Sequence, residues 1–223
     1  TRVFNALVSV VNFAISEYAL DLKNPFTRVY HDRNAGVTKR LPIPIKNIRI
    51  VQNQCKLIDD DMRWLIALIS DTGMRLAEAA GLATSDLILN HEVPHIIVQQ
   101  HEWRSIKTSS SERKIPLVGA ALWAGQRIIS NSDNLHAFPR YNKSKTTNSN
   151  SASAALNKWL KGYVPEGCSV HSFRHSMRDR LRAVSCPIEM IDQIGGWSRQ
   201  TVGQEYGDGY DLQLICEFMN KFK

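Results

Sequence analysis

The apolar residues of this chain change their spacing twice along the sequence. From Leu57 to Gly73 they recur at helical spacing, and a second short helical stretch, MRLAEAAGL, follows at once. Three short stretches rich in β-branched residues follow, as is typical of strands: DLILN, HIIVQQ and RKIPLV. Helical spacing returns in ALWAGQRIIS and continues toward the C-terminus. The pattern predicts a mainly α protein with a small antiparallel β-sheet (α+β), whose last two strands form a hairpin around HEWRSIKTSSSE.

Proline, glycine and polar residues divide the chain near its beginning. A helical pattern starts at the first residues and stops near Pro25, and HDRNAGVTKRLPIP has the composition of a linker. Helical spacing resumes at Leu57 and stops at Gly73. We expect residues 1–30 to be the terminal helix of a preceding module whose remainder is absent, residues 31–44 to be a linker, and residues 45–223 to be the main domain.

The charge balance predicts a polyanionic partner. The net charge is +7 and the pI is about 9.3, which favours nucleic acid over membrane. No apolar run reaches a membrane-spanning length and no signal peptide is present, so we expect a cytoplasmic protein. Four scattered cysteines form no CxxC pair, and we expect buried free thiols: Cys55, Cys168, Cys186 and Cys216.

The polar stretch RYNKSKTTNSNSASA, residues 140–154, is low in complexity, which predicts a mobile surface loop. This loop and the linker supply basic side chains that can contact DNA phosphates. The candidates for DNA binding are Lys39, Arg40, Lys143 and Lys145.

Two motifs carry arginines that can bind an anion. In DTGMRLAEAAGL, Arg75 follows a glycine at the start of a helix, and Glu78 lies one turn on, where it can hold the guanidinium. The ordinary alternative is a surface ion pair on a helix. In HSFRH, His171 and Arg174 are three residues apart and share a helical face, and His175 is expected to be a packed, hydrogen-bonded structural histidine.

The segment HEVPH, residues 91–95, formally matches a zinc motif of metallopeptidases. That site needs both histidines on one helix. Pro94 breaks a helix between them, and the segment leads into a predicted strand, so this alternative is remote.

The stretch IGGWSRQTVGQEYGDGYDL places Trp197 nine residues before Tyr206, among glycines that let the backbone bring a ring close to a phosphate. A tyrosine hydroxyl is a poor nucleophile unless neighbouring groups activate it. By itself Tyr206 is most simply an ordinary half-buried tyrosine.

Four features follow one another along the chain: T-G-x-R-x-x-E, a hairpin lysine, H-x-F-R-H and W-x8-Y. In this order they resemble the tyrosine recombinases, the phage integrase family, over roughly residues 45–223. The resemblance implies a site-specific DNA recombinase that forms a covalent 3′-phosphotyrosyl intermediate, with no metal and no cofactor. It also implies double-stranded DNA as partner, a monomer in solution, a homotetramer on paired DNA sites, accessory DNA-bending proteins, and association with the nucleoid of a bacterial cell.

The resemblance assigns roles to individual residues. Arg75 and Arg174 correspond to the catalytic arginines, and Glu78 is the acidic companion of Arg75. Lys107, His171 and Tyr206 correspond to the hairpin lysine, the proton acceptor and the nucleophile. Trp197 stands where most members have histidine; its indole donates a hydrogen bond but cannot transfer a proton. Lys114 competes with Lys107, and Tyr210 competes with Tyr206.

Other functions of the same fold remain open at this point: a type IB topoisomerase, a telomere resolvase, or a DNA-binding protein that has lost catalysis.

The C-terminal stretch DLQLICEFMNKFK predicts an amphipathic helix with an apolar face of Leu212, Ile215, Met219 and Phe222. In a monomer we expect that face in the core of its own domain, and we expect docking on a neighbouring protomer only on DNA.

Overall fold

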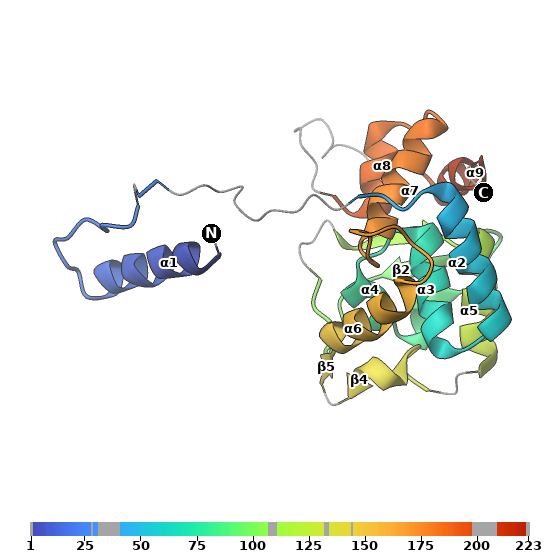
Figure 1. Cartoon of the computed structure of the whole chain (residues 1–223), viewed down its shortest axis with the longest axis horizontal. Coiled ribbons are helices and arrows are strands. Elements are labelled where there is room, and N and C mark those ends of the chain that lie inside the picture. The colour runs from blue at the N-terminus through green and yellow to red at the C-terminus, as the bar shows by residue number, and fades with distance from the viewer. Residues whose placement is uncertain are drawn as a thin grey trace. The chain divides into compact units, whose positions relative to one another are not determined.

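The computed structural model describes residues 2–27, 29–30, 41–106, 111–131, 134–143, 145–197 and 209–221, and Figure 1 shows its ribbon. The chain divides into two compact units, Thr1–Lys39 and Arg40–Lys223. Among the described residues, no helix has the length and apolar character that a membrane crossing requires.

The first unit contains helix α1, Arg2–Glu17. The helix ends earlier than the sequence pattern predicts because Ala19 adopts the left-handed conformation, with φ of 45°, while the Leu20 N–H bonds to the Ile15 carbonyl at 3.0 Å. The Asn24 amide then donates to the Val8 carbonyl at 3.0 Å, which folds the following segment back onto the helix.

Helix α3, Asp61–Thr72, is the centre of the second unit. Its N-terminus is capped by Asp60, whose carboxylate accepts from the Arg63 N–H at 3.0 Å, and it ends at Gly73, with φ of 61°. It packs against helices α2, Ile45–Ile58, α5, Gly119–Asn131, and α7, Ser172–Ala183.

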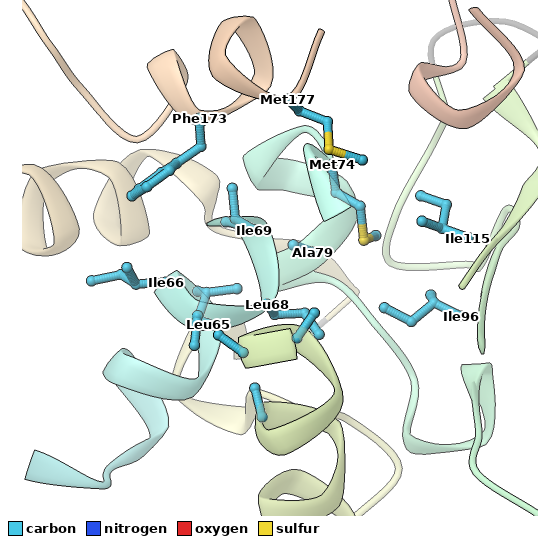
Figure 2. Close-up of a cluster of buried hydrophobic side chains, with 14 of the residues drawn as sticks. Leu65, Ile66, Leu68, Ile69, Met74, Ala79, Ile96, Ile115, Phe173 and Met177 are labelled. Carbon is cyan, nitrogen blue, oxygen red and sulfur yellow. The ribbon is translucent and has the colours of Figure 1, made fainter. Parts of the chain in front are cut away.

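Figure 2 shows the core around α3, where Leu65, Ile66, Leu68 and Ile69 lie among side chains from several other elements. Phe173 and Met177 approach from α7, and Ile96 and Ile115 approach from the sheet. All eight are at most 1% exposed. This core holds α7 and the sheet on either side of α3, and both carry residues of the candidate site.

The small sheet is antiparallel, as predicted. It contains β1, Leu87–Ile88, β2, His95–Val98, and β3, Arg113–Pro116, in the order β1-β2-β3. The 3-10 turn η1, Thr84–Asp86, precedes it. In the β2–β3 register, Ile96 is opposite Ile115 and Val98 is opposite Arg113.

Helix α2 was missing from the sequence prediction, which found helical spacing only from Leu57. Its buried residues are few, namely Ile48, Val51 and Cys55. Its outer face carries exposed apolar side chains such as Ile50 and Leu57, so the contrast between its two faces is weak in the sequence.

The predicted mobile loop over residues 140–154 is wrong, because the structure contains regular elements there. The turn η3, Pro139–Tyr141, leads into the hairpin β4, Asn142–Lys143, and β5, Thr146–Thr147, and then into α6, Ser149–Leu160. The Asn148 side chain caps α6 by accepting from Ser151 N–H, and the buried Asn142 amide donates to two carbonyls. Asparagine and serine therefore act here as capping residues rather than as loop formers.

Three short helices complete the unit: α4, Leu76–Ala80, α8, Ile188–Gly195, and α9, Leu212–Lys221. Helix α9 packs against β3 and buries Ile215 and Met219 in the core of its own unit. Leu212 is half-buried, and Phe222 lies outside the described residues.

All four cysteines are free thiols. Cys55 and Cys186 are buried as expected, whereas Cys168 and Cys216 are only half-buried.

Candidate active site

Arg75 lies at the start of α4, and Glu78 binds it twice. The Glu78 carboxylate accepts from the Arg75 guanidinium at 2.5 Å and from the Arg75 backbone N–H at 3.0 Å. That backbone N–H is therefore already bonded to the Glu78 carboxylate and is not available to an external anion. The Arg75 side chain is 26% exposed, so its remaining N–H groups can reach a ligand.

Arg113, which the sequence analysis did not single out, binds Glu78 from the opposite side. Its guanidinium contacts the Glu78 carboxylate at 2.8 Å, and both side chains are almost fully buried. Burial alone would raise the pKa of Glu78, but the charge of Arg113 and the hydrogen bonds from Arg113 and Arg75 lower it. The sequence contained a signal for the burial of Arg113. Side chains alternate between the two faces of a strand, so Arg113 lies on the same inward face of β3 as Ile115, and Lys114 lies on the other face.

Arg174 projects inward from α7 and is 4% exposed. It donates to the Gly73 carbonyl at 2.9 Å and to the Gly195 carbonyl at 2.5 Å. Burial, followed by the charges of Arg75 and Arg113, lowers the pKa of Arg174 to about 9. The guanidinium is therefore protonated at neutral pH, in surroundings that an additional anion would stabilise.

The C-terminal end of α8 accepts hydrogen bonds from all three of these arginines. Consecutive carbonyls at Ile194, Gly195 and Gly196 accept hydrogen bonds from Arg113, Arg174 and Arg75, at 2.8, 2.5 and 2.9 Å. These carbonyls lie at the negative end of the helix, where cations are favourable. Gly196 has a φ of 61°, and a Cβ there would lie 2.8 Å from the Arg113 guanidinium. The paired glycines therefore permit this close approach.

Trp197 lies against two arginines of α7. The Cζ atoms of Arg174 and Arg178 are 4.1 and 4.6 Å from the centroid of one of its rings, within the range of cation–π contact. Asp192 of α8 pairs with Arg178 at 3.1 Å. A Cβ on Gly195 would lie 1.8 Å from the Trp197 ring, so only glycine leaves space for this position of the indole.

We refer to Arg75, Arg113, Arg174 and Arg178 as the arginine cluster. Four guanidinium groups here meet two carboxylates, those of Glu78 and Asp192. The excess of buried and half-buried positive charge favours binding of an anion with several oxygen atoms.

His171 lies at the start of α7, one turn before Arg174, and is exposed. The prediction for His175 is wrong: the residue is exposed rather than packed, and its ring contacts that of His171 edge to face, with centroids 5.4 Å apart. His171 and His175 are four residues apart, so both lie on the same face of α7, and that face is exposed.

The structure brings together Arg75, Glu78, Arg174 and Trp197 of the residues selected from the sequence. Lys107, Tyr206, Lys39 and Arg40 lie outside the described residues. Lys114 is exposed on β3, and Lys143 and Lys145 are exposed at the β4–β5 hairpin. Tyr210 is half-buried, and its backbone bonds to Gln193.

The HEVPH segment does not form a helix. His95 begins β2, and the His91 and His95 side chains both contact the Val93 carbonyl. Within the described part of the chain, no group of three or more His, Cys, Asp or Glu side chains is arranged to hold a metal ion. The helical geometry that a metallopeptidase of this type needs is therefore lacking at this segment.

Comparisons with known proteins identify the family and the fold. No curated protein matches the chain. Among solved structures, the integrase of transposon Tn1549 in complex with circular intermediate DNA has a TM-score of 0.65 and 20% identity, covering 98% of this chain and 77% of that one. A lambda integrase tetramer bound to a Holliday junction has a TM-score of 0.59 and 15% identity, covering 92% of this chain and 58% of that one. XerA recombinase has a TM-score of 0.55 and 13% identity, covering 97% and 74%.

At these identities the structural likeness shows the fold, which is that of a tyrosine recombinase catalytic domain. The family itself is shown by sequence, because the model of the phage integrase family matches residues 47–211, more than half of the chain. The chain therefore belongs to the phage integrase family of tyrosine recombinases, which are DNA strand transferases.

Proposed function

We propose that this protein integrates or excises a phage or another mobile element by cleaving and rejoining DNA at specific sites through a covalent 3′-phosphotyrosyl intermediate. The observation that supports this most directly is the arginine cluster. Its excess positive charge is concentrated around Glu78 and the end of α8, and the side chains of Arg75 and Arg178 are partly exposed to a ligand. A DNA phosphodiester is an anion that fits this charge.

Arg75 and Arg174 offset the negative charge that grows on the non-bridging phosphate oxygens in the transition state. Glu78 and Arg113 keep Arg75 in place, and the α8 carbonyls orient both arginines before DNA binds. Such preorganisation means that little rearrangement is needed at the moment of reaction.

Tyr206 is the proposed nucleophile. His171 accepts its proton, and Lys107 donates a proton to the leaving 5′ oxygen. Trp197 donates a hydrogen bond to a phosphate oxygen but moves no proton, so proton transfer depends on His171 and Lys107. The phosphotyrosyl bond conserves the energy of the broken phosphodiester, so a 5′-hydroxyl of another strand can rejoin the DNA without ATP.

Basic side chains outside the cluster extend the proposed contact with DNA: Lys39, Arg40, Lys143 and Lys145. We also propose a monomer in solution that forms a homotetramer on paired DNA sites, assisted by accessory DNA-bending proteins, at the nucleoid of a bacterial cell. The lambda integrase tetramer bound to a Holliday junction supports the homotetramer by likeness of fold.

A double-stranded substrate with a nick near the cleavage site tests the proposal, because loss of a short fragment traps the covalent adduct. We expect the wild-type protein to form the adduct, Tyr206→Phe to form none while still binding DNA, and Tyr210→Phe to form it. Absence of adduct from the wild-type protein on its own DNA site would identify a DNA-binding protein without catalysis. Adduct from Tyr206→Phe but not from Tyr210→Phe would assign the nucleophile to Tyr210.

A further inference from the structure

Gln193, a half-buried residue in the last turn of α8, is bonded through its side-chain amide to the backbone of a single residue, Tyr210. Its Nε2 donates to the Tyr210 carbonyl at 2.9 Å, and its Oε1 accepts from the Tyr210 N–H at 2.9 Å. One side chain therefore satisfies both backbone groups of Tyr210, as a neighbouring strand would. We call this pair of hydrogen bonds the Gln193 amide bridge.

The backbone conformation of the residue before Tyr210 allows this bridge. Gly209 has a φ of 77°, in the left-handed region that favours glycine, and a Cβ there would lie 2.7 Å from Gln193 Oε1. A side chain at position 209 would therefore displace the amide or the backbone.

The bridge joins two parts of the active site. The residue after Gln193 begins the row of carbonyls that receive Arg113, Arg174 and Arg75. The same turn of α8 is thus bonded on one side to the arginine cluster and on the other to the backbone at Tyr210. Trp197 then follows directly, held against Arg174.

Tyr206 precedes Tyr210 by four residues, so at most about 14 Å of extended chain separates the proposed nucleophile from the bridge. A fixed point this close limits the positions that the tyrosine can take. Without it, the next fixed point is the start of α9, where Leu214 N–H bonds to Asp211 and Ile215 enters the core.

We infer that Gln193 is a positioning residue for the proposed nucleophile: the amide bridge fixes the backbone of Tyr210, four residues after Tyr206 in the chain, relative to the arginine cluster. This inference rests on the proposed function. Because a misplacement of about 1 Å can cost roughly 100-fold in rate, loss of the bridge should slow cleavage by about 10- to 100-fold. DNA affinity should change less than about threefold, because Gln193 contributes no charge to DNA binding.

The first test compares Gln193→Met, which keeps the size of the side chain and removes both hydrogen bonds, with Gln52→Met. Gln52 is a half-buried glutamine of α2 that donates one hydrogen bond, to Ser70, and lies outside the arginine cluster. The measurements are the single-turnover rate of adduct formation on the nicked substrate at saturating protein, the DNA affinity, and the thermal unfolding midpoint. We expect the rate to fall only for Gln193→Met, with similar midpoints and affinities for both variants.

The second test disturbs the bridge from its other side. Gly209→Ala should slow cleavage by a comparable factor. The double variant Gln193→Met/Gly209→Ala should be no slower than the slower single variant, because both changes break the same contact. A merely structural role would instead lower the thermal unfolding midpoint while leaving the single-turnover rate of the folded protein unchanged.

A wild-type cleavage rate in Gln193→Met, or multiplied rate losses in the double variant, would overturn the positioning role. Either result would leave the proposed function intact, because that function depends on adduct formation by the wild-type protein and its loss in Tyr206→Phe.

Discussion

At the scale of single residues, Glu78 is the carboxylate on which the site depends. It is 3% exposed and neutralises part of the charge of both Arg75 and Arg113. A buried ion pair contributes little compared with an apolar replacement of both partners, but removal of one partner leaves an uncompensated charge. We therefore expect substitution of Glu78 to reduce both stability and the proposed catalysis.

The pKa of Glu78 is lowered from its ordinary value of 4.5, which predicts a specific pH dependence. A carboxylate with a depressed folded-state pKa stabilises the fold above its unfolded-state pKa, and the contribution is lost as pH falls through the folded-state pKa. At pH 7, Glu78→Gln should lower the free energy of unfolding by about 3 kcal/mol. The difference between wild type and variant should shrink progressively below about pH 4.5.

Urea unfolding of both proteins between pH 7 and pH 3 measures this difference. Asp179→Asn is the control, because Asp179 and its partner Arg182 both have side chains 54% exposed, and an exposed pair contributes at most about 1 kcal/mol. A difference between wild type and Glu78→Gln that stays constant down to pH 3 would contradict the assignment.

At the scale of elements, the C-terminal end of α8 makes many of the contacts that hold the candidate site together. Its last carbonyls receive three arginines, its Gln193 holds Tyr210, and the glycine pair allows Trp197 and Arg113 to approach. In the sequence, Tyr206 lies between α8 and α9, and both of these helices have residues in one core.

Gly195→Ala tests this arrangement. The added methyl group would overlap the Trp197 ring, so the indole must leave its position against Arg174. We expect adduct formation to slow by about 10- to 100-fold, by the same positional argument, while DNA binding is retained. Gly162→Ala is the matched control, because the nearest atom to its Cβ would be a carbonyl oxygen at 3.8 Å, an ordinary contact. Equal rates for the two variants would show that the position of the indole does not matter for cleavage.

At the scale of the whole molecule, the net charge of +7 predicts DNA binding that weakens steeply with salt. Lys143 and Lys145 are exposed at the β4–β5 hairpin, where proposed phosphate contacts would each release a counterion.

Substitution of both hairpin lysines by alanine should reduce the slope of log K against log salt concentration by about 2, or roughly 1 for each lysine, and should weaken binding to all sequences alike. Lys56→Ala, at an exposed lysine of α2, should leave the slope unchanged. Fluorescence anisotropy titrations at several salt concentrations measure the slopes, and an unchanged slope in the double variant would remove the hairpin from the DNA interface.

Much of the fold was predictable because the responsible signals are local. Helical periodicity indicated α3, α5, α7, α8 and α9, and β-branched stretches indicated the three strands, in agreement with the structure. The weakly two-faced α2 was missed over most of its length, and α6 was predicted only from residue 154, because its first turns depend on the cap from Asn148.

The sequence by itself determined the family, the mainly α class and the candidate residues, because motif order and spacing are properties of the chain. Only the tertiary structure decided that Arg113 shares Glu78 with Arg75, that Arg178 lies against Trp197, and that Gln193 holds Tyr210. Each of these contacts joins residues from different elements. Such contacts depend on how the helices and the sheet pack around α3, and no periodicity within one segment records that packing.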